Sequence, residues 1–157
     1  MTGRTAWLAC AAAVVAAVYA SAGLAQNQAA FAPTCTLRIH VDGFRNTVGN
    51  LGSVVFASPD GWPDDTSKSL RVGPSPIDKP TRTAVAEWQV PPGTYGVAAI
   101  HDENGNARLD RNFLGIPKEG FGFANNPRIF LGPAPFRAAL VHVACPVTEI
   151  TIHLIYK

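Results

Sequence analysis

The sequence predicts an all-β domain, namely a small antiparallel β-sandwich of about seven strands with one long loop. Apolar and polar residues alternate along several short segments, as expected for strands with one buried face. The 14 Gly and 13 Pro residues separate these segments, which is typical of sandwiches with short strands and many turns. Charged residues make up only 15% of the chain and the net charge is +2, so no nucleic-acid-binding surface is expected.

The N-terminal segment has the pattern of a secretory signal peptide. Arg4 precedes an apolar run over residues 7–18, and Gly23 and Ala25 occupy the −3 and −1 positions of a cleavage site. An uncleaved membrane anchor is the alternative, but the apolar run is short for a membrane span. We therefore expect residues 1–25 to be removed, leaving a periplasmic or secreted protein with no transmembrane segment.

Cleavage would leave a flexible leader over residues 26–34 and one β-sandwich domain over residues 35–157. Two cysteines remain, Cys35 and Cys145. Each cysteine falls on the apolar side of the alternating segment next to it, so both thiols are expected to point toward the core. In an exported chain, an even number of cysteines favours a disulfide. The sequence thus predicts a Cys35–Cys145 disulfide, with two separate buried thiols as the alternative.

Six strands are predicted, over residues 35–42, 53–57, 84–90, 95–100, 140–143 and 149–156. The first alternates without a fault from Cys35 to Asp42, as a half-buried antiparallel strand does. The second is a short apolar run, typical of a strand that is covered on both faces. A Pro-Pro-Gly-Thr turn at residues 91–94 separates the third strand from the fourth.

Two segments interrupt this pattern. Residues 58–82 contain five prolines and two glycines, so we expect a long crossing loop there, with room for an edge strand. Residues 101–139 mix Asp, Asn and Gly with aromatic residues. Long loops in compact domains are either functional or disordered, and the aromatic residues favour a functional loop.

The start of the second segment has the spacing of a calcium-binding loop. If Asp102 is position 1, oxygen-bearing side chains fall at positions 1, 3, 5 and 9, which are Asp102, Asn104, Asn106 and Asp110. The carbonyl of Arg108 would occupy position 7. This is the front half of an EF-hand-type loop, in which alternate residues surround one cation.

Two positions depart from that calcium-binding pattern. Position 6, where glycine allows a sharp turn, is Ala107, and position 12, where a glutamate binds with both oxygens, is Phe113. The alternative is an Asx-rich turn whose side chains bind their own backbone. With two charged ligands and no glutamate, any calcium affinity should be weak, around 10⁻⁴–10⁻³ M.

The rest of the loop predicts a second kind of site. Aromatic rings and polar groups alternate there, and they could bind a small molecule, a glycan or a protein within residues 101–136. The alternative is that the phenylalanines pack the loop onto the sandwich. The candidate ligand-binding residues are His101, Glu119, Phe121, Phe123, Asn125 and Asn126.

A catalytic arrangement is less well supported by the sequence. His101 beside Asp102 resembles a general base with an orienting carboxylate, but adjacent residues on a strand point to opposite faces. We therefore expect a non-catalytic binding module. The alternative is a periplasmic hydrolase that uses His101 with Asp102 or Glu119.

The stretch from His101 to Asn126, with Pro-Gly-Thr-Tyr at residues 92–95 before it, resembles family 2141 of the domain-of-unknown-function series. This resemblance covers about residues 35–157. It implies an exported bacterial protein with a transthyretin-like (prealbumin-like) sandwich, and it implies no activity. The family usually has glycine where this chain has Ala107, which weakens the expected calcium geometry.

Overall fold

The computed structural model describes residues 33–130 and 132–157. The predicted signal peptide and residues 26–32 of the predicted leader lie outside these described residues. The described part is all-β and has two short 3₁₀ segments, η1 (Thr66–Lys68) and η2 (Phe136–Ala139). None of its helices is long and apolar enough to cross a membrane. Its strands are β1 (Cys35–Asp42), β2 (Asn50–Phe56), β3 (Arg71–Ser75), β4 (Ile77–Asp78), β5 (Thr83–Val90), β6 (Gly93–Asp102), β7 (Phe121–Phe123), β8 (Leu140–Val143) and β9 (Val147–His153).

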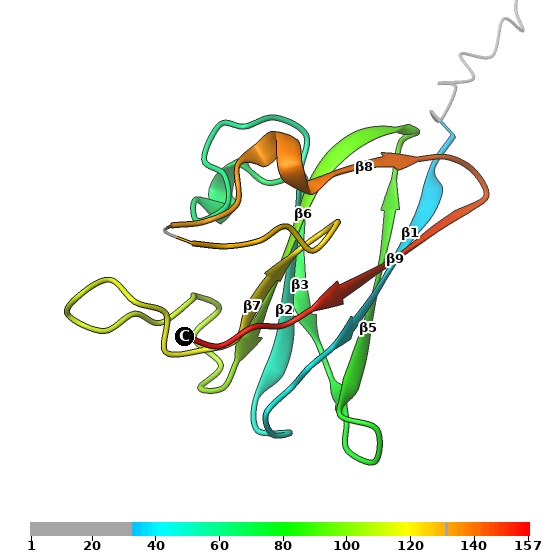
Figure 1. Cartoon of the computed structure of the whole chain (residues 1–157). Helices are drawn as coiled ribbons and strands as arrows, with labels where there is room; N and C mark the ends of the chain where they lie inside the picture. The colour runs from blue at the N-terminus through cyan, green and yellow to red at the C-terminus, as the bar shows by residue number, and fades with distance from the viewer. Residues whose placement is uncertain (1–32, 131) are drawn as a thin grey trace, which may run out of the picture. The chain divides into compact units, whose positions relative to one another are not determined.

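These strands form two sheets that face each other across the core (Figure 1). The first sheet has the order β4-β5-β1-β9, and the second has the order β3-β2-β6-β7 with β8 also paired to β6. The predicted sandwich is thus confirmed, with nine strands instead of about seven. One pair departs from the antiparallel expectation, because β1 and β9 run parallel, with Thr36 opposite Val147 and Asp42 opposite His153.

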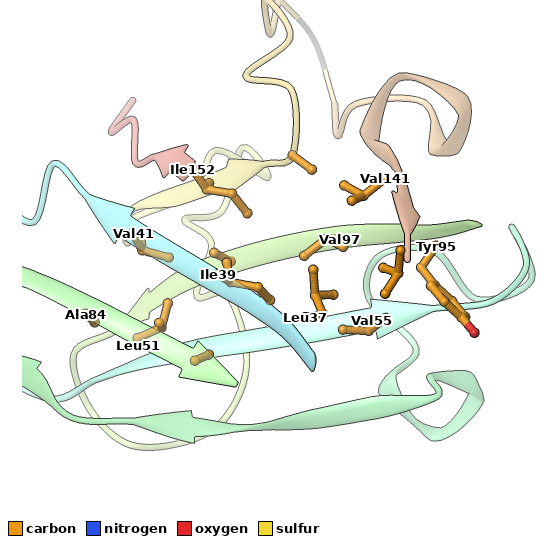
Figure 2. Close-up of a cluster of buried hydrophobic side chains, with 14 of the residues drawn as sticks. Leu37, Ile39, Val41, Leu51, Val55, Ala84, Tyr95, Val97, Val141 and Ile152 are labelled. Carbon is orange, nitrogen blue, oxygen red and sulfur yellow. The ribbon is translucent and has the colours of Figure 1, made fainter. Parts of the chain in front are cut away.

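The core between the sheets follows directly from the alternation in the sequence. In β1, every second residue from Cys35 is buried and the residues between them are half-buried. Figure 2 shows three of these side chains, those of Leu37, Ile39 and Val41, pointing toward the side chains of the opposite sheet. Burial of this apolar surface is the main force that joins the two sheets.

A second apolar cluster covers the outer face of β6, which explains why Tyr95 to Ala99 are all buried. The half-buried Trp62 packs against this cluster, with its ring centre 5.5 Å from that of Phe56 and 5.5 Å from that of Phe136. Its indole nitrogen donates a hydrogen bond of 2.8 Å to the carbonyl of Ala134. The second sheet therefore has side chains packed on both faces, as the apolar run at residues 53–57 predicted.

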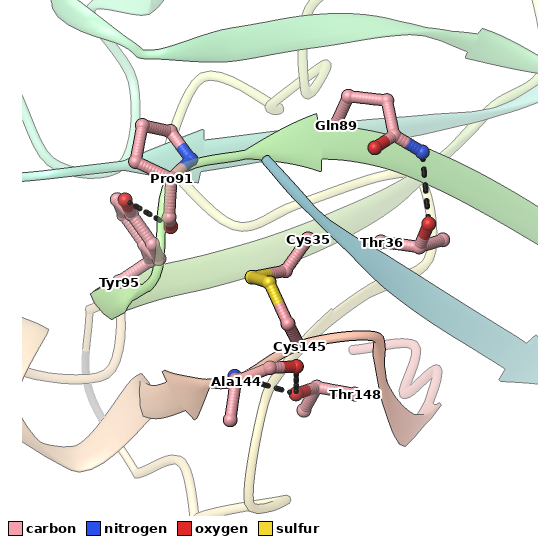
Figure 3. The surroundings of a disulfide bond; sticks show 8 residues. All are labelled: Cys35, Thr36, Gln89, Pro91, Tyr95, Ala144, Cys145 and Thr148. Atoms are coloured by element: carbon pink, nitrogen blue, oxygen red, sulfur yellow. Dashed lines mark hydrogen bonds between the residues drawn. A yellow bond between two sulfur atoms is a disulfide. The ribbon is translucent and has the colours of Figure 1, made fainter. Parts of the chain in front are cut away.

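The predicted disulfide joins Cys35 and Cys145, whose positions are 110 residues apart in the sequence (Figure 3). Cys35 is buried as expected, but Cys145 is exposed. Cys145 does not follow the alternation of β8, because β8 ends at Val143 and the chain turns toward β9 before it reaches the cysteine. In this turn, the hydroxyl of Thr148 accepts a hydrogen bond of 3.0 Å from the backbone N–H of Ala144.

The two long predicted loops contain more regular structure than the one edge strand that was allowed for within residues 58–82. Residues 58–82 include η1, β3 and β4, and residues 101–139 include β7 and η2. The last strand is also shorter than predicted and ends at His153. Beyond it, Ile155 still forms an isolated bridge to Phe121, so the C-terminal residues stay beside β7.

Candidate functional site

Residues 101–120 comprise the last two residues of β6 and the segment that joins β6 to β7, and we call them the 101–120 lobe. The two strands are antiparallel neighbours, with Ile100 opposite Phe121. The lobe therefore leaves the second sheet and returns to it at the same end. Figure 1 shows it, in yellow-green, projecting beyond the sheets.

Asp102 organises the first half of the lobe. Its side chain is 5% exposed, and its carboxylate accepts hydrogen bonds from the backbone N–H groups of Gly105 (2.8 Å), Asn106 (3.1 Å) and Ala107 (2.8 Å). Three N–H donors around one carboxylate fix the turn. Ala107 adopts a left-handed conformation there, with φ of 58°.

The other predicted calcium ligands lie together in the same turn. The amide nitrogens of Asn104 and Asn106 donate hydrogen bonds of 2.7 and 2.9 Å to the two carboxylate oxygens of Asp110. The amide oxygen of Asn106 accepts a hydrogen bond of 2.8 Å from the N–H of Arg108. These are the bonds of an Asx-rich turn, so a cation would have to displace the two amide nitrogens from Asp110.

The side chains of this turn that could bind a cation carry few charges. Among the described residues there is no group of three or more His, Cys, Asp or Glu that could hold a metal ion. The four clustered side chains of the turn include only two carboxylates, which are those of Asp102 and Asp110. Their chemistry suits a hard cation with oxygen ligands and does not suit a transition metal.

Glu119 closes the base of the lobe. It is 3% exposed, and its carboxylate accepts hydrogen bonds from the backbone N–H groups of Glu103 (2.9 Å) and Asp110 (3.0 Å). The N–H of Lys118 donates a further bond of 2.8 Å to the carbonyl of Asp110. Glu119 therefore links the start, middle and end of the lobe, and both of its oxygens are engaged by the protein itself.

His101 is completely buried, and both of its ring nitrogens have protein partners. Nε2 lies 2.8 Å from the carbonyl oxygen of Val48, and Nδ1 lies 2.8 Å from the hydroxyl of Tyr156. A carbonyl can only accept, so Nε2 carries the hydrogen, and in the neutral ring Nδ1 accepts from the tyrosine. This geometry leaves no ring nitrogen for a substrate.

An arginine clamp, formed by Arg45 and Glu103, lies against the base of the lobe. Arg45 donates from Nε to Glu103 Oε1 at 2.8 Å and from Nη2 to Oε2, and Asn46 adds a bond of 2.7 Å to Oε1. The hydrogen bond from Arg45 lowers the pKa of Glu103 from 4.5 to about 2. The guanidinium also lies 4.8 Å from the ring centre of Tyr156, whose pKa is raised by burial.

Two residues that contact the base of the lobe, Arg45 and Tyr156, were not identified from the sequence as part of the site. Arg45 and Glu103 lie 58 residues apart, and no local pattern connects such residues. Tyr156 was expected only as part of the last strand, over residues 149–156, whereas it lies beyond the end of β9 and is half-buried. Its hydroxyl was the available signal, because a buried phenol needs a hydrogen-bonding partner, and His101 is that partner.

The predicted ligand-binding residues beyond the lobe have structural contacts. Phe121 and Phe123 are each 5% exposed, and their rings pack in the outer apolar cluster. Asn125 and Asn126 have left-handed backbones, with φ of 65° and 47°. The Asn125 amide nitrogen donates to the Leu140 carbonyl at 2.9 Å. The Asn126 amide oxygen accepts from the His153 N–H at 2.8 Å.

The tip of the lobe, residues 111–117, exposes two adjacent apolar side chains. Phe113 is 95% exposed and Leu114 is 67% exposed. The turn beneath them is well bonded, because Asn112 Oδ1 accepts from the N–H groups of Leu114 (2.9 Å) and Ile116 (3.0 Å). From the sequence, Phe113 was considered by name only as a missing calcium ligand. The available signal was the apolar run from Phe113 to Ile116, which lies between Asn112 and Lys118.

Charges are segregated within the lobe. Between residues 104 and 118 the exposed charged residues are Arg108, Arg111 and Lys118, all of them cationic. The acidic residues of the lobe are buried or half-buried, as described above for Asp102 and Glu119. Arg111 Nη2 lies 3.6 Å from an oxygen of Asp64. The outer surface of the lobe is therefore apolar at its tip and basic around it.

Comparison with known proteins identifies one family. A family described as "Uncharacterized protein conserved in bacteria (DUF2141)" matches residues 39–151, which include the whole lobe. No curated protein and no solved structure matches the chain.

Proposed function

The chain belongs to this DUF2141 family of uncharacterized bacterial proteins, and from its own geometry we propose that it is a non-catalytic binding module. In this proposal the 101–136 loop, and above all the 101–120 lobe within it, contacts the partner. The Cys35–Cys145 disulfide supports action in an oxidising compartment, in agreement with the expected periplasmic or secreted location.

The observation that carries the proposal is the way the lobe is built. Its buried polar groups all bind the lobe's own backbone or the sandwich, as Asp102, Glu119 and His101 do. Its tip, by contrast, displays Phe113 to solvent. A rigidly held loop with an exposed apolar tip on a sandwich scaffold is the usual arrangement of a recognition element.

The hydrolase alternative receives no support from this geometry. A general base must lie within hydrogen-bond reach of a substrate proton, whereas His101 is completely buried. Glu119 is also buried, with both oxygens bound by backbone N–H groups. Activity would therefore require the base of the lobe to open.

Photocrosslinking in the native bacterium tests the binding proposal. We would place p-benzoylphenylalanine at Phe113, with Val72 as a matched control, because Val72 is also exposed (49%) but lies on β3. We expect a discrete adduct from position 113 and none from position 72. Absence of any adduct at 113, to a protein or to a lipid, or the same adducts at both positions, would contradict the proposal.

We further propose that residues 102–110 bind calcium weakly, through the side chains of Asp102, Asn104, Asn106 and Asp110 and the carbonyl of Arg108. The convergence of these side chains supports it, as does the left-handed Ala107 at the position where calcium loops turn sharply. Calcium at ten times Kd would stabilise the fold by about 1.4 kcal/mol.

A melting experiment tests this calcium proposal. The Tm of the wild type should be higher in millimolar calcium than in chelator, and magnesium should have little effect because it requires a small octahedral shell. Asp110→Asn, which keeps the shape of the side chain, should abolish the increase. If both proteins melt at the same temperature with calcium and with chelator, the segment is only an Asx-rich turn.

A further inference from the structure

We propose that the tip of the 101–120 lobe docks on an anionic lipid surface, with Phe113 and Leu114 entering the interface and Arg108, Arg111 and Lys118 contacting the head groups. This inference rests on the proposed function, since it names the partner of the same lobe. It starts from the exposure of two adjacent large apolar side chains, 95% for Phe113 and 67% for Leu114.

The shape of the tip favours lipid as the occupant. Asn112 holds the turn, and an isolated bridge between Arg111 and Pro117 closes it. The apolar side chains therefore stand on a narrow, convex and hydrogen-bonded base. A protein partner would need a matching pocket for such a tip, whereas the fluid interface of a bilayer accommodates it without one.

The charges around the tip indicate which lipid surface is involved. The exposed charged residues between 104 and 118 are all cationic. The acidic groups of the same segment are bound by the protein itself: the buried Asp102 binds backbone N–H groups, and the half-buried Asp110 binds asparagine amides. Outside this segment, one exposed carboxylate, that of Asp64, lies 3.6 Å from Arg111, which leaves Arg108 and Lys118 as the main cations for head groups. This arrangement is attractive for anionic head groups, because each lysine or arginine near such a surface contributes to binding.

Apolar insertion and basic contacts support each other. Apolar insertion of a small tip gives weak, reversible binding on its own, and stable attachment requires a second signal such as a basic patch. Here both signals occur within one lobe, because Lys118 and Arg108 flank the residues that carry Phe113 and Leu114. The proposed docking is therefore peripheral, reversible and sensitive to salt.

Vesicle sedimentation of the purified protein, with chelator present, tests the proposal. The vesicles would contain phosphatidylethanolamine with phosphatidylglycerol, or phosphatidylcholine alone. We expect at least tenfold tighter binding to the anionic vesicles, weakened by 0.5 M NaCl. Phe113→Ser/Leu114→Ser should reduce the affinity more than tenfold, and Arg108→Gln/Lys118→Gln should reduce it roughly 30-fold, since each cation near the surface contributes about fivefold.

Val72→Ser/Val85→Ser is the matched control, because these valines are 49% and 44% exposed but lie on β3 and β5. This control variant should bind vesicles like the wild type. The two proteins have the same N-terminal residues, so these residues cannot cause a difference between them. Equal vesicle binding by the wild type and the Phe113/Leu114 variant would overturn the proposal, as would equal binding to both lipids. A protein adduct from position 113 without vesicle binding would also overturn it, but would leave the binding-module proposal intact.

Discussion

Ala107 has a left-handed backbone, with φ of 58°, in a turn where its N–H donates to Asp102. Residues with a Cβ atom avoid this conformation, and glycine adopts it without strain. The spacing of the surrounding Asp and Asn residues predicted the turn, and the structure shows how the alanine is held there. The three bonds to Asp102 offset the local strain.

Ala107→Gly should stabilise the fold by up to about 1 kcal/mol, because relief of the left-handed strain exceeds the cost of the freer unfolded chain. Ala144→Gly is the matched control. Ala144 is also exposed and has no positive φ, so this change should destabilise by about 0.5–1 kcal/mol. Urea unfolding measures both. A loss of stability for Ala107→Gly equal to that of the control would contradict the argument.

Glu103 gives the fold a specific pH dependence. Its pKa is about 2 in the folded protein instead of 4.5, so its bond with Arg45 stabilises the fold above pH 4.5. This contribution is lost as the pH falls from 4.5 toward 2. Glu103→Gln should cost about 1–2 kcal/mol at pH 7, and the difference from the wild type should vanish near pH 2. A constant difference between pH 7 and pH 2, measured by urea unfolding, would refute this role.

At the scale of elements, Glu119 is the buried side chain that joins separate parts of the lobe. Its carboxylate binds the N–H groups of Glu103 and Asp110, which lie on either side of the Asx-rich turn. Arg45 also joins the two ends of the lobe, because its guanidinium donates to Glu103 and to the carbonyl of Lys118. Backbone bonds such as that from Lys118 to Asp110 assist. The long segment is therefore an ordered lobe, and one buried side chain connects its parts.

Glu119→Gln should loosen the lobe, because one of its two backbone donors would then face an amide N–H₂ group. We expect a loss of roughly 1–3 kcal/mol, the cost of leaving a buried donor without an acceptor. Hydrogen exchange should quicken at the amides of Glu103 and Asp110 and remain unchanged in β1. Glu87→Gln, on an exposed ion pair with Arg38, is the control and should leave both exchange and Tm unchanged. Unaltered exchange at residues 103 and 110 would contradict the role of Glu119.

The elements that the sequence predicted well are those with a long, clean alternation. β1 has its predicted bounds, and β5 and β6 differ from theirs by few residues. β7 was missed because a Phe-Gly-Phe triplet is too short for any period to appear. β3 was expected only as an unspecified edge strand, because Pro74 obscures its pattern. The same limit applies to the site, where spacing identified the Asx-rich turn but did not reveal that Glu119 is buried beneath it.

At the scale of the whole molecule, the parallel pairing of β1 with β9 joins the two ends of the domain. Alternation within each strand predicts which face is buried, but it does not identify the neighbouring strand. The sandwich could therefore be predicted from the sequence, whereas this crossover could not. The disulfide also links β1 to β9, since Cys35 is the first residue of β1 and Cys145 lies just before β9.

Loss of the disulfide should destabilise the protein by about 2–5 kcal/mol, because the bond closes a loop of about 110 residues in the unfolded chain. Urea unfolding with and without dithiothreitol measures this effect. Cys35→Ala/Cys145→Ala is the control, since its stability should not respond to the reductant. If the wild type is equally stable in both conditions, the bond does not contribute to stability.

The position of the chain ends relative to the lobe determines how the protein should be mounted in an experiment. β1 leads from Cys35 to Asp42 over about 23 Å, at 3.3 Å per residue, and Asp42 pairs with His153. Tyr156 touches His101, so the C-terminus lies beside the lobe and Cys35 lies at the far end of the strand. A biosensor surface that holds the protein by a tag before Cys35 would leave the lobe exposed to solution. A tag after Lys157 would place the lobe next to the support.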